Sequence, residues 1–182
     1  MNHEIQSNPS HEMKSSYRMF GGMIITSMIA MYALMYLNTY ELSHVRWSET
    51  RFYMTLIMGA TMAVIMLTFM RNMYKNKKLN LAIYVGSLLV FLVSLFLVRS
   101  QTLVTDSSYM SGMIPHHSIA ILTSENAQIK DLRVRELADK IIEAQRREIK
   151  EMDWLISDIA ENGLASTPTE ADARPVPDFD AE

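Results

Sequence analysis

The chain has 182 residues, a formal net charge of −3 and a mean hydropathy of +0.04, and it contains 16 methionines but no cysteine. The lack of cysteine excludes disulfide bonds and thiolate metal sites. The sequence also lacks a basic nucleic-acid patch, a Gly-rich phosphate loop and a nucleophile–base motif, so we expect neither a nucleic-acid partner nor an enzyme.

The N-terminal half alternates polar segments with long uncharged stretches. Residues 1–16 are polar, and we expect this tail to be mobile. Residues 19–40, 52–70 and 79–98 contain no Asp, Glu, Lys or Arg, and their lengths are 22, 19 and 20 residues. A helix needs roughly 20 apolar residues to cross a bilayer. We therefore predict three transmembrane helices within residues 17–98, embedded in membrane lipid.

The distribution of basic residues predicts the orientation of these spans. Cytoplasmic loops carry an excess of Lys and Arg. The N-terminal tail and the loop between spans two and three carry six basic residues, against three on the other side (Lys14, Arg18, Arg71, Lys75, Lys77 and Lys78 against Arg46, Arg51 and Arg99). We expect a multi-pass protein of the inner (cell) membrane, with its N-terminus in the cytoplasm and residues 99–182 in the periplasm or at the cell surface.

Methionine recurs along the first two spans, every four residues in the second (Met54, Met58, Met62, Met66 and Met70). Ordinary packing or lipid contact accounts for such residues, and the alternative is a thioether relay for a soft metal. Gly59 and Ala63 are spaced for close helix packing in lipid.

Two further helices are predicted after the third span. The first runs from about residue 106 to 128 with Thr105 or Asp106 as its N-cap. Pro115 predicts a kink or restart in it; alternatively, the helix begins at Pro115.

The second helix runs from Asp131 to about Glu161 and ends at Asn162-Gly163. Residues 103–162 would form a helical hairpin, and residues 163–182, which hold three of the five prolines and an acidic excess, would be a disordered tail.

A hairpin of two helices buries little surface by itself. The second helix has an apolar face at helical spacing (Leu137, Ile141, Ala144, Met152, Leu155 and Ile159). Because so small a core is marginal, we expect an all-α fold in which a second copy completes a four-helix bundle as a homodimer. Docking onto another membrane protein would meet the same need.

The first hairpin helix carries a face of potential metal ligands. At about 100° per residue, Asp106, Met110, Met113 and His117 fall within a roughly 60° arc, with His116 beside it. Thioether and imidazole ligands suit Cu(I) or Ag(I). We expect His117, Met113 and Met110 to bind the metal directly. His116 would serve a second or shared ion, and Asp106 would orient an imidazole.

Glu148 and Met152 lie on the second helix, one turn apart. A carboxylate on an apolar face needs a partner, and we expect Glu148 to bond His116, His117 or Tyr109. The alternative is direct ligation, which would suit Cu(II) or zinc better than Cu(I). Met152 is either a further ligand or a core residue.

Two blocks of the hairpin resemble the domain-of-unknown-function 305 family. They are Asp106-x-x-Tyr109-Met110-x-x-Met113-Ile114-Pro115-His116-His117-x-x-Ala120-Ile121 and Leu137-Ala138-x-x-Ile141-Ile142-x-x-Gln145-x-x-Glu148-Ile149-x-x-Met152-x-Trp154-Leu155. The resemblance implies a ferritin-like, exported helical bundle, and some members bind copper or silver in copper tolerance. Larger members repeat the Met-His-His helix, whereas this chain has it once, which supports dimerisation. The three spans lie outside the resemblance.

Together these features predict a membrane-anchored, extracytoplasmic metal-binding protein for copper homeostasis or tolerance. It would bind Cu(I), Ag(I) or, less readily, Cu(II), and buffer the ion or pass it to a copper-handling partner. The alternative is an assembly or sensor subunit of a membrane complex in which the hairpin is a docking element.

Overall fold

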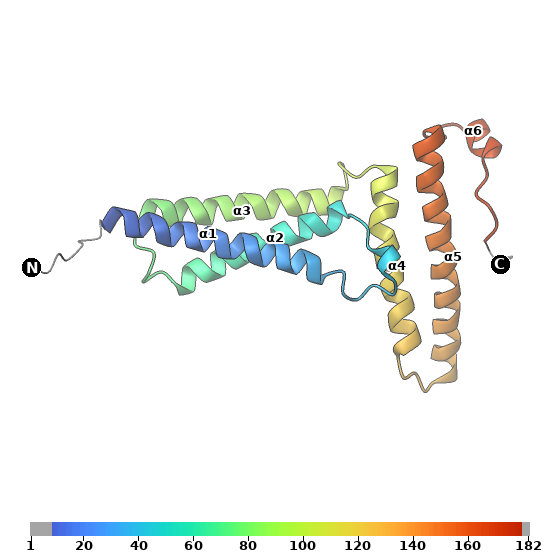
Figure 1. Cartoon of the computed structure of the whole chain (residues 1–182), viewed down its shortest axis with the longest axis horizontal. Coiled ribbons are helices and arrows are strands. Elements are labelled where there is room, and N and C mark those ends of the chain that lie inside the picture. The colour runs from blue at the N-terminus through green and yellow to red at the C-terminus, as the bar shows by residue number, and fades with distance from the viewer. Residues whose placement is uncertain (1–8, 180–182) are drawn as a thin grey trace, which may run out of the picture. The chain divides into compact units, whose positions relative to one another are not determined.

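The computed structural model describes residues 9–179, with side chains from residue 15 onward. Within this range all regular elements are helical and no strand occurs, which confirms the all-α prediction (Figure 1). The expectation of a mobile tail falls partly on residues 1–8, which lie outside the described residues; from Pro9 onward the chain is helical. The chain divides into two compact units, residues 1–34 with 50–102 and residues 35–49 with 103–182.

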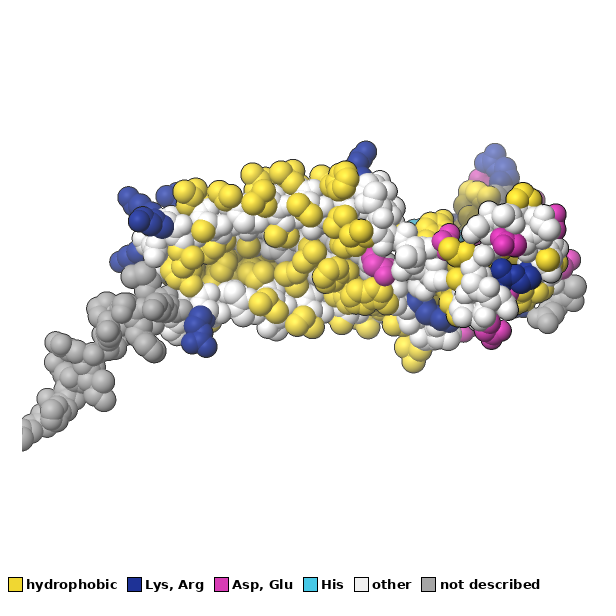
Figure 2. Space-filling view, turned by 90° about the horizontal axis from the view of Figure 1, so that it is seen from above, with side chains coloured by type: hydrophobic (Ala, Val, Ile, Leu, Met, Phe, Trp, Pro, Cys, Tyr) yellow, Lys and Arg dark blue, Asp and Glu magenta, His cyan; other side chains and the backbone are white. Residues whose placement is uncertain are grey.

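The first unit contains three helices of membrane length: α1 (Pro9–Leu34), α2 (Glu49–Phe69) and α3 (Lys77–Ser100). The stretches long and apolar enough to span a membrane are Ser15–Leu34 and the whole of α2 and α3. Large apolar side chains project outward along them, as Figure 2 shows, with Lys and Arg at the ends of the unit. Such a surface is suited to hydrocarbon rather than water.

A small core holds the three spans together. Phe20, Ala63, Leu67 and Tyr74 form its buried cluster, and the hydroxyl of Tyr17 donates a hydrogen bond of 2.6 Å to Asn80 Oδ1. Gly59 and Ala63 are both buried, as the small-residue spacing predicted. Met66 and Met70 pack against the core cluster, so these two methionines of the second span are packing residues.

One close contact joins α1 to α2 within this unit. A Cβ atom built on Gly59 would clash with Sδ of Met28, so the thioether occupies the space that a side chain would fill. The absence of a side chain at Gly59 is therefore what lets Met28 approach α2 this closely.

The second unit is built on the predicted hairpin. It consists of α4 (Asp106–Asn126) and α5 (Leu132–Asn162), which run antiparallel and pack along their length (Figure 1). The side chain of Thr105 caps α4 and that of Asp131 caps α5, while Gly163, at φ 78°, ends α5. These termini agree with the sequence prediction.

Pro115 lies inside an unbroken α4 and is fully buried. The alternative that the helix begins at Pro115 was wrong, because the Thr105 cap starts the helix ten residues earlier. The proline leaves the carbonyl of Ser111 without its usual helical N–H donor.

The core of the hairpin is formed by Ile114, Ile121 and Ile149, with Met152 and Ile156 packed against it. The predicted apolar face of α5 is displaced, because Ala138 and Ile149 are buried whereas Leu137 is 58% exposed. Apolar residues cover a wider part of the α5 surface than the part that contacts α4. Helical periodicity alone therefore did not predict which of these residues are buried.

Residues 35–49, here called the connector, pack against the hairpin as part of the second unit. The sequence prediction had assigned them to the transmembrane domain and had extended the first span to residue 40. The connector contains one short 3₁₀ helix, η1 (Leu42–His44), and the Tyr36 hydroxyl donates a hydrogen bond to the Arg46 carbonyl across it. These polar contacts favour the folded connector over continuation of the first helix.

The predicted disordered tail is also structured in part. Helix α6 (Pro168–Ala173) begins with a capping box between Thr167 and Glu170. Arg174 forms an ion pair of 2.6 Å with Asp158 of α5. The proline count had suggested disorder, but Pro168 occupies the first turn of this helix, where proline is tolerated.

Candidate metal centre

The unbroken helix α4 places the predicted ligands on one face. Met110, Met113 and His117 are related by three and four residues, which in a regular α-helix brings them to the same side. Met110 is buried and Met113 is half-buried. The side chain of His117 is 13% exposed, so this face is largely shielded from water.

His117 meets Glu148 across the hairpin. Nδ1 of His117 lies 3.0 Å from Oε2 of Glu148, which also accepts a hydrogen bond from the Gln145 side chain. The buried Nδ1 atom nevertheless has no well-directed hydrogen bond among the described residues. A buried imidazole nitrogen without a partner is costly, and a metal ion would supply one.

Burial lowers the pKa of His117 below its ordinary value of 6.5. The negative charge of Glu148 acts in the opposite direction, and His116 adds a smaller lowering effect. The outcome is an imidazole that is neutral at pH 7. Only the neutral ring can donate a lone pair to a metal, so the electrostatics of the site favour ligation.

The other predicted site residues are not all brought together. His116 is exposed, with its ring centroid 6.2 Å from that of His117. Asp106 is exposed in the first turn of α4, and Met152 packs into the hairpin core. Within residues 9–179 no group of three or more His, Cys, Asp or Glu side chains is placed to hold a metal. The candidate centre is therefore the face of His117, Met113 and Met110, with Glu148 beside it.

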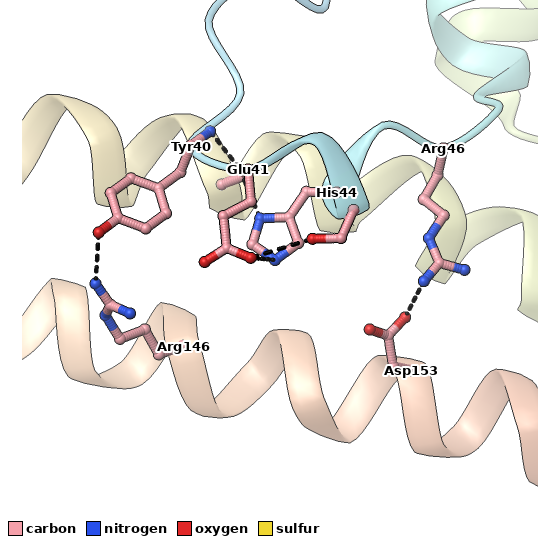
Figure 3. A network of polar contacts seen from close by, with 8 residues as sticks. Tyr40, Glu41, His44, Arg46, Arg146 and Asp153 are labelled. Atoms are coloured by element: carbon pink, nitrogen blue, oxygen red, sulfur yellow. Dashed lines mark hydrogen bonds and ion pairs between the residues drawn. The ribbon is translucent and has the colours of Figure 1, made fainter.

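The sequence analysis missed a cluster on another face of α4. The hydroxyl of the fully buried Ser118 accepts a hydrogen bond of 2.7 Å from the Tyr40 backbone N–H and lies 2.9 Å from Nδ1 of His44. Nε2 of His44 is 3.9 Å from Glu41 (Figure 3). Helical spacing gave no sign of this cluster, because its partners lie 74 and 78 residues away along the chain.

The order of hydroxyl, imidazole and carboxylate in this cluster is that of a hydrolase triad. A nucleophile must reach its substrate, however, and Ser118 is fully buried while already accepting the Tyr40 N–H. These three side chains therefore hold the connector against α4.

Charged side chains attach the connector to α5 at two more points. Arg46 forms an ion pair of 2.9 Å with Asp153. Arg146 donates a hydrogen bond to the Tyr40 hydroxyl at 3.1 Å (Figure 3). It also pairs with Glu125 of α4 at 2.6 Å. The connector, α4 and α5 thus form one polar network.

Fold and site define a class of protein: three helices of membrane length combined with a helical hairpin that carries a His and Met face. The sequence profile described as "Domain of unknown function (DUF305)" matches residues 100–176. An uncharacterized protein of Acanthamoeba polyphaga mimivirus is 32% identical over 147 residues, which cover 77% of this chain and 95% of the viral protein. The chain belongs to the DUF305 family.

The viral relative extends the similarity beyond the hairpin. Residues 100–182 make up less than half of the chain, so a match over 77% of it also covers part of the membrane-length helices. No solved structure matches the chain significantly.

Proposed function

We propose that this protein is a membrane-anchored, extracytoplasmic metal-binding protein that takes up Cu(I) or Ag(I) through His117, Met113 and Met110. Its function would be to buffer the ion or hand it to another copper-handling protein. Cu(II) is the less favoured cargo, because two of the three ligands are soft thioethers. No bond-making chemistry is part of the proposal.

The observation that carries the proposal is the buried Nδ1 atom of His117, which receives no well-directed hydrogen bond from the part of the chain that the structure describes. His117 lies on one helical face with two methionines. Glu148 lies 3.0 Å from the same atom. It can orient the ring, or join the ligands when the ion is Cu(II). Asp106, His116 and Met152 lie elsewhere in the hairpin and are secondary candidates.

The proposed location is the cell (inner) membrane, with the N-terminus in the cytoplasm and the hairpin outside. The excess of Lys and Arg on the N-terminal tail and the α2–α3 loop supports this orientation. Three spans place the connector and the hairpin on the same side of the bilayer, and their packing into one unit requires this.

We also propose a homodimer. The predicted apolar strip of α5 lies beside the hairpin core, with Leu137 58% exposed and Glu148 along its length. A second copy covering this strip would shield the His117 face from water and give His116 a route to a shared ion. The connector already covers another side of the hairpin, so dimerisation is not the hairpin's only source of packing.

An anaerobic Cu(I) titration of the full-length chain in detergent, against a chromophoric competitor, tests the proposal. We expect sub-micromolar binding that weakens in His117→Ala and in a Met110→Leu/Met113→Leu double variant by at least the roughly 10- to 100-fold that loss of an outer-shell partner costs, because these residues are direct ligands. Met73→Leu, which changes a methionine of the α2–α3 loop, is the matched control and should bind normally. Unchanged affinity in His117→Ala would refute the site.

The second candidate function is that of an assembly or sensor subunit. It is favoured by the exposed apolar residues Leu132, Val134 and Leu137 at the start of α5, which could dock a membrane partner. Absence of competitive Cu(I) binding by the folded chain, together with co-purification of a stoichiometric membrane partner from metal-free cells, would favour this function.

A further inference from the structure

The connector makes its contacts with the hairpin at a few fixed points. The Tyr40 N–H and His44 Nδ1 meet the Ser118 hydroxyl at 2.7 and 2.9 Å, and Arg46 meets Asp153 at 2.9 Å (Figure 3). A cavity of about 330 Å³ lies beside Tyr40 and His44, lined by residues of the connector and of both helices. Directed polar contacts therefore fix the connector's position, together with the packing of Tyr40 against the hairpin core.

Of the residues that contact the connector, Ser118 is the one next to the metal face. It directly follows His117 in α4, so the two side chains point about 100° apart around the same turn. Ser118 is fully buried, and water cannot replace a partner that it loses. Any rotation of this turn that released Ser118 would also turn His117 away from Glu148.

We infer that Ser118 and His44 are positioning residues for the metal face: their hydrogen bond fixes the rotation of α4 that brings His117 to Glu148. The inference rests on the proposed metal-binding function, but its geometric part can be tested without metal. It assigns the connector between the first two spans to the binding unit.

The test compares three variants of the full-length chain in detergent. His44→Ala removes the ring nitrogen that meets Ser118, whereas His44→Asn places an amide nitrogen near the same position. Ser43→Ala is the control, because among the described residues the Ser43 hydroxyl bonds Glu41 within the connector and no residue of α4 or α5. Each variant is labelled with ¹³C-methyl methionine, and its Cu(I) affinity and the metal-free methyl spectrum are recorded.

We expect His44→Ala to bind Cu(I) about tenfold more weakly, at the low end of the effect of residues that orient ligands. The metal-free signal of Met110, on the same face as His117, should shift in this variant. His44→Asn should restore both properties to within about twofold of the unaltered chain, and Ser43→Ala should change neither. Rescue by asparagine separates positioning from a general loss of stability.

Unaltered affinity and an unaltered Met110 signal in His44→Ala would overturn the inference. Equal loss in His44→Asn and His44→Ala would also overturn it, because the hydrogen bond would then not be the cause. If the unaltered chain binds no Cu(I), the proposed function fails, while the metal-free spectra still establish or refute the positioning of α4.

Discussion

At the scale of single residues, His117 is subject to opposing effects. Burial favours the neutral ring, and the carboxylate of Glu148 favours the protonated ring. Burial has the larger effect, and it leaves the pKa below 6.5. The same residue therefore combines a neutral imidazole with a buried nitrogen that has no well-directed hydrogen bond among residues 15–179.

The lowered pKa predicts how metal binding depends on pH. Protons compete with the metal only below the pKa of His117, so Cu(I) affinity should hold through pH 6.5 and fall at lower pH. Competition titrations between pH 7.5 and 5 should show this fall, and thioethers alone would not produce it. His117→Ala should show weak, pH-independent binding; a wild-type profile that stays flat throughout this range would contradict the assignment.

The same shift predicts lower stability in acid. Because the unfolded chain takes up a proton on His117 more readily than the folded chain, the contribution of this residue is present above pH 6.5 and is lost as the pH falls through the lowered folded value.

Removing the charge of Glu148 should lower the pKa of His117 further. Glu148→Gln keeps the shape of the side chain but abolishes the attraction that favours the protonated ring. An NMR titration of the His117 ring in the metal-free chain would measure the change. Glu143→Gln, an exposed carboxylate on the same helix, is the control and should leave the titration unchanged. A raised pKa in Glu148→Gln would show that the two groups do not interact as described.

Residue-level prediction from sequence succeeded where helical periodicity applied. It placed Met110, Met113 and His117 on one face and named His117 among the possible partners of Glu148. It could not choose between His116, His117 and Tyr109, because that choice depends on the rotation of α5 against α4. The cluster around Ser118 could not be predicted from the sequence, because contacts between residues more than 70 positions apart leave no local sequence pattern.

At the scale of elements, the helix boundaries followed from capping residues. Thr105, Asp131 and Gly163 marked termini that the structure confirms. Two elements were mispredicted. The connector ends the first helix early because of its tertiary contacts with the hairpin, and α6 forms in a proline-containing segment because a local capping box starts it.

The contact between α1 and α2 gives a prediction for the membrane-length unit. Gly59→Ala places a methyl group where the Met28 thioether lies, so α1 must shift or Met28 must change its rotamer. We expect the melting temperature in detergent to fall by several degrees, although alanine favours a helix by up to about 1 kcal/mol over glycine. Gly86→Ala is the matched control, since a Cβ there meets nothing within 4 Å, and its melting temperature should be unchanged or higher. Equal melting temperatures for both variants would refute the packing.

At the scale of the whole molecule, the two units constrain the topology. The connector and the hairpin pack into one unit although α2 and α3 lie between them in the sequence. Two crossings return the chain to the same side of a membrane, so the packing agrees with both α2 and α3 crossing and would conflict with only one of them crossing.

Single-cysteine labelling can test this topology, because the natural chain has no cysteine. We expect Ser43→Cys in the connector and Asn126→Cys at the end of α4 to react with an impermeant maleimide added outside intact cells. Lys75→Cys in the α2–α3 loop should react only after permeabilisation. If positions 43 and 126 react on opposite sides of the membrane, the connector and the hairpin cannot pack into one unit. If the labelling pattern of positions 43, 75 and 126 is reversed as a whole, only the proposed orientation is contradicted.

The central claim, a soft-metal site of thioether and imidazole ligands, is tested most directly by X-ray absorption spectroscopy at the copper edge. The sample is the full-length chain loaded with one equivalent of Cu(I), compared with its Met110→Leu/Met113→Leu and His117→Ala variants. We predict both sulfur and nitrogen neighbours around copper, with sulfur lost in the first variant and nitrogen reduced in the second. Bound copper surrounded only by nitrogen and oxygen, or a spectrum identical in all three samples, would contradict the account.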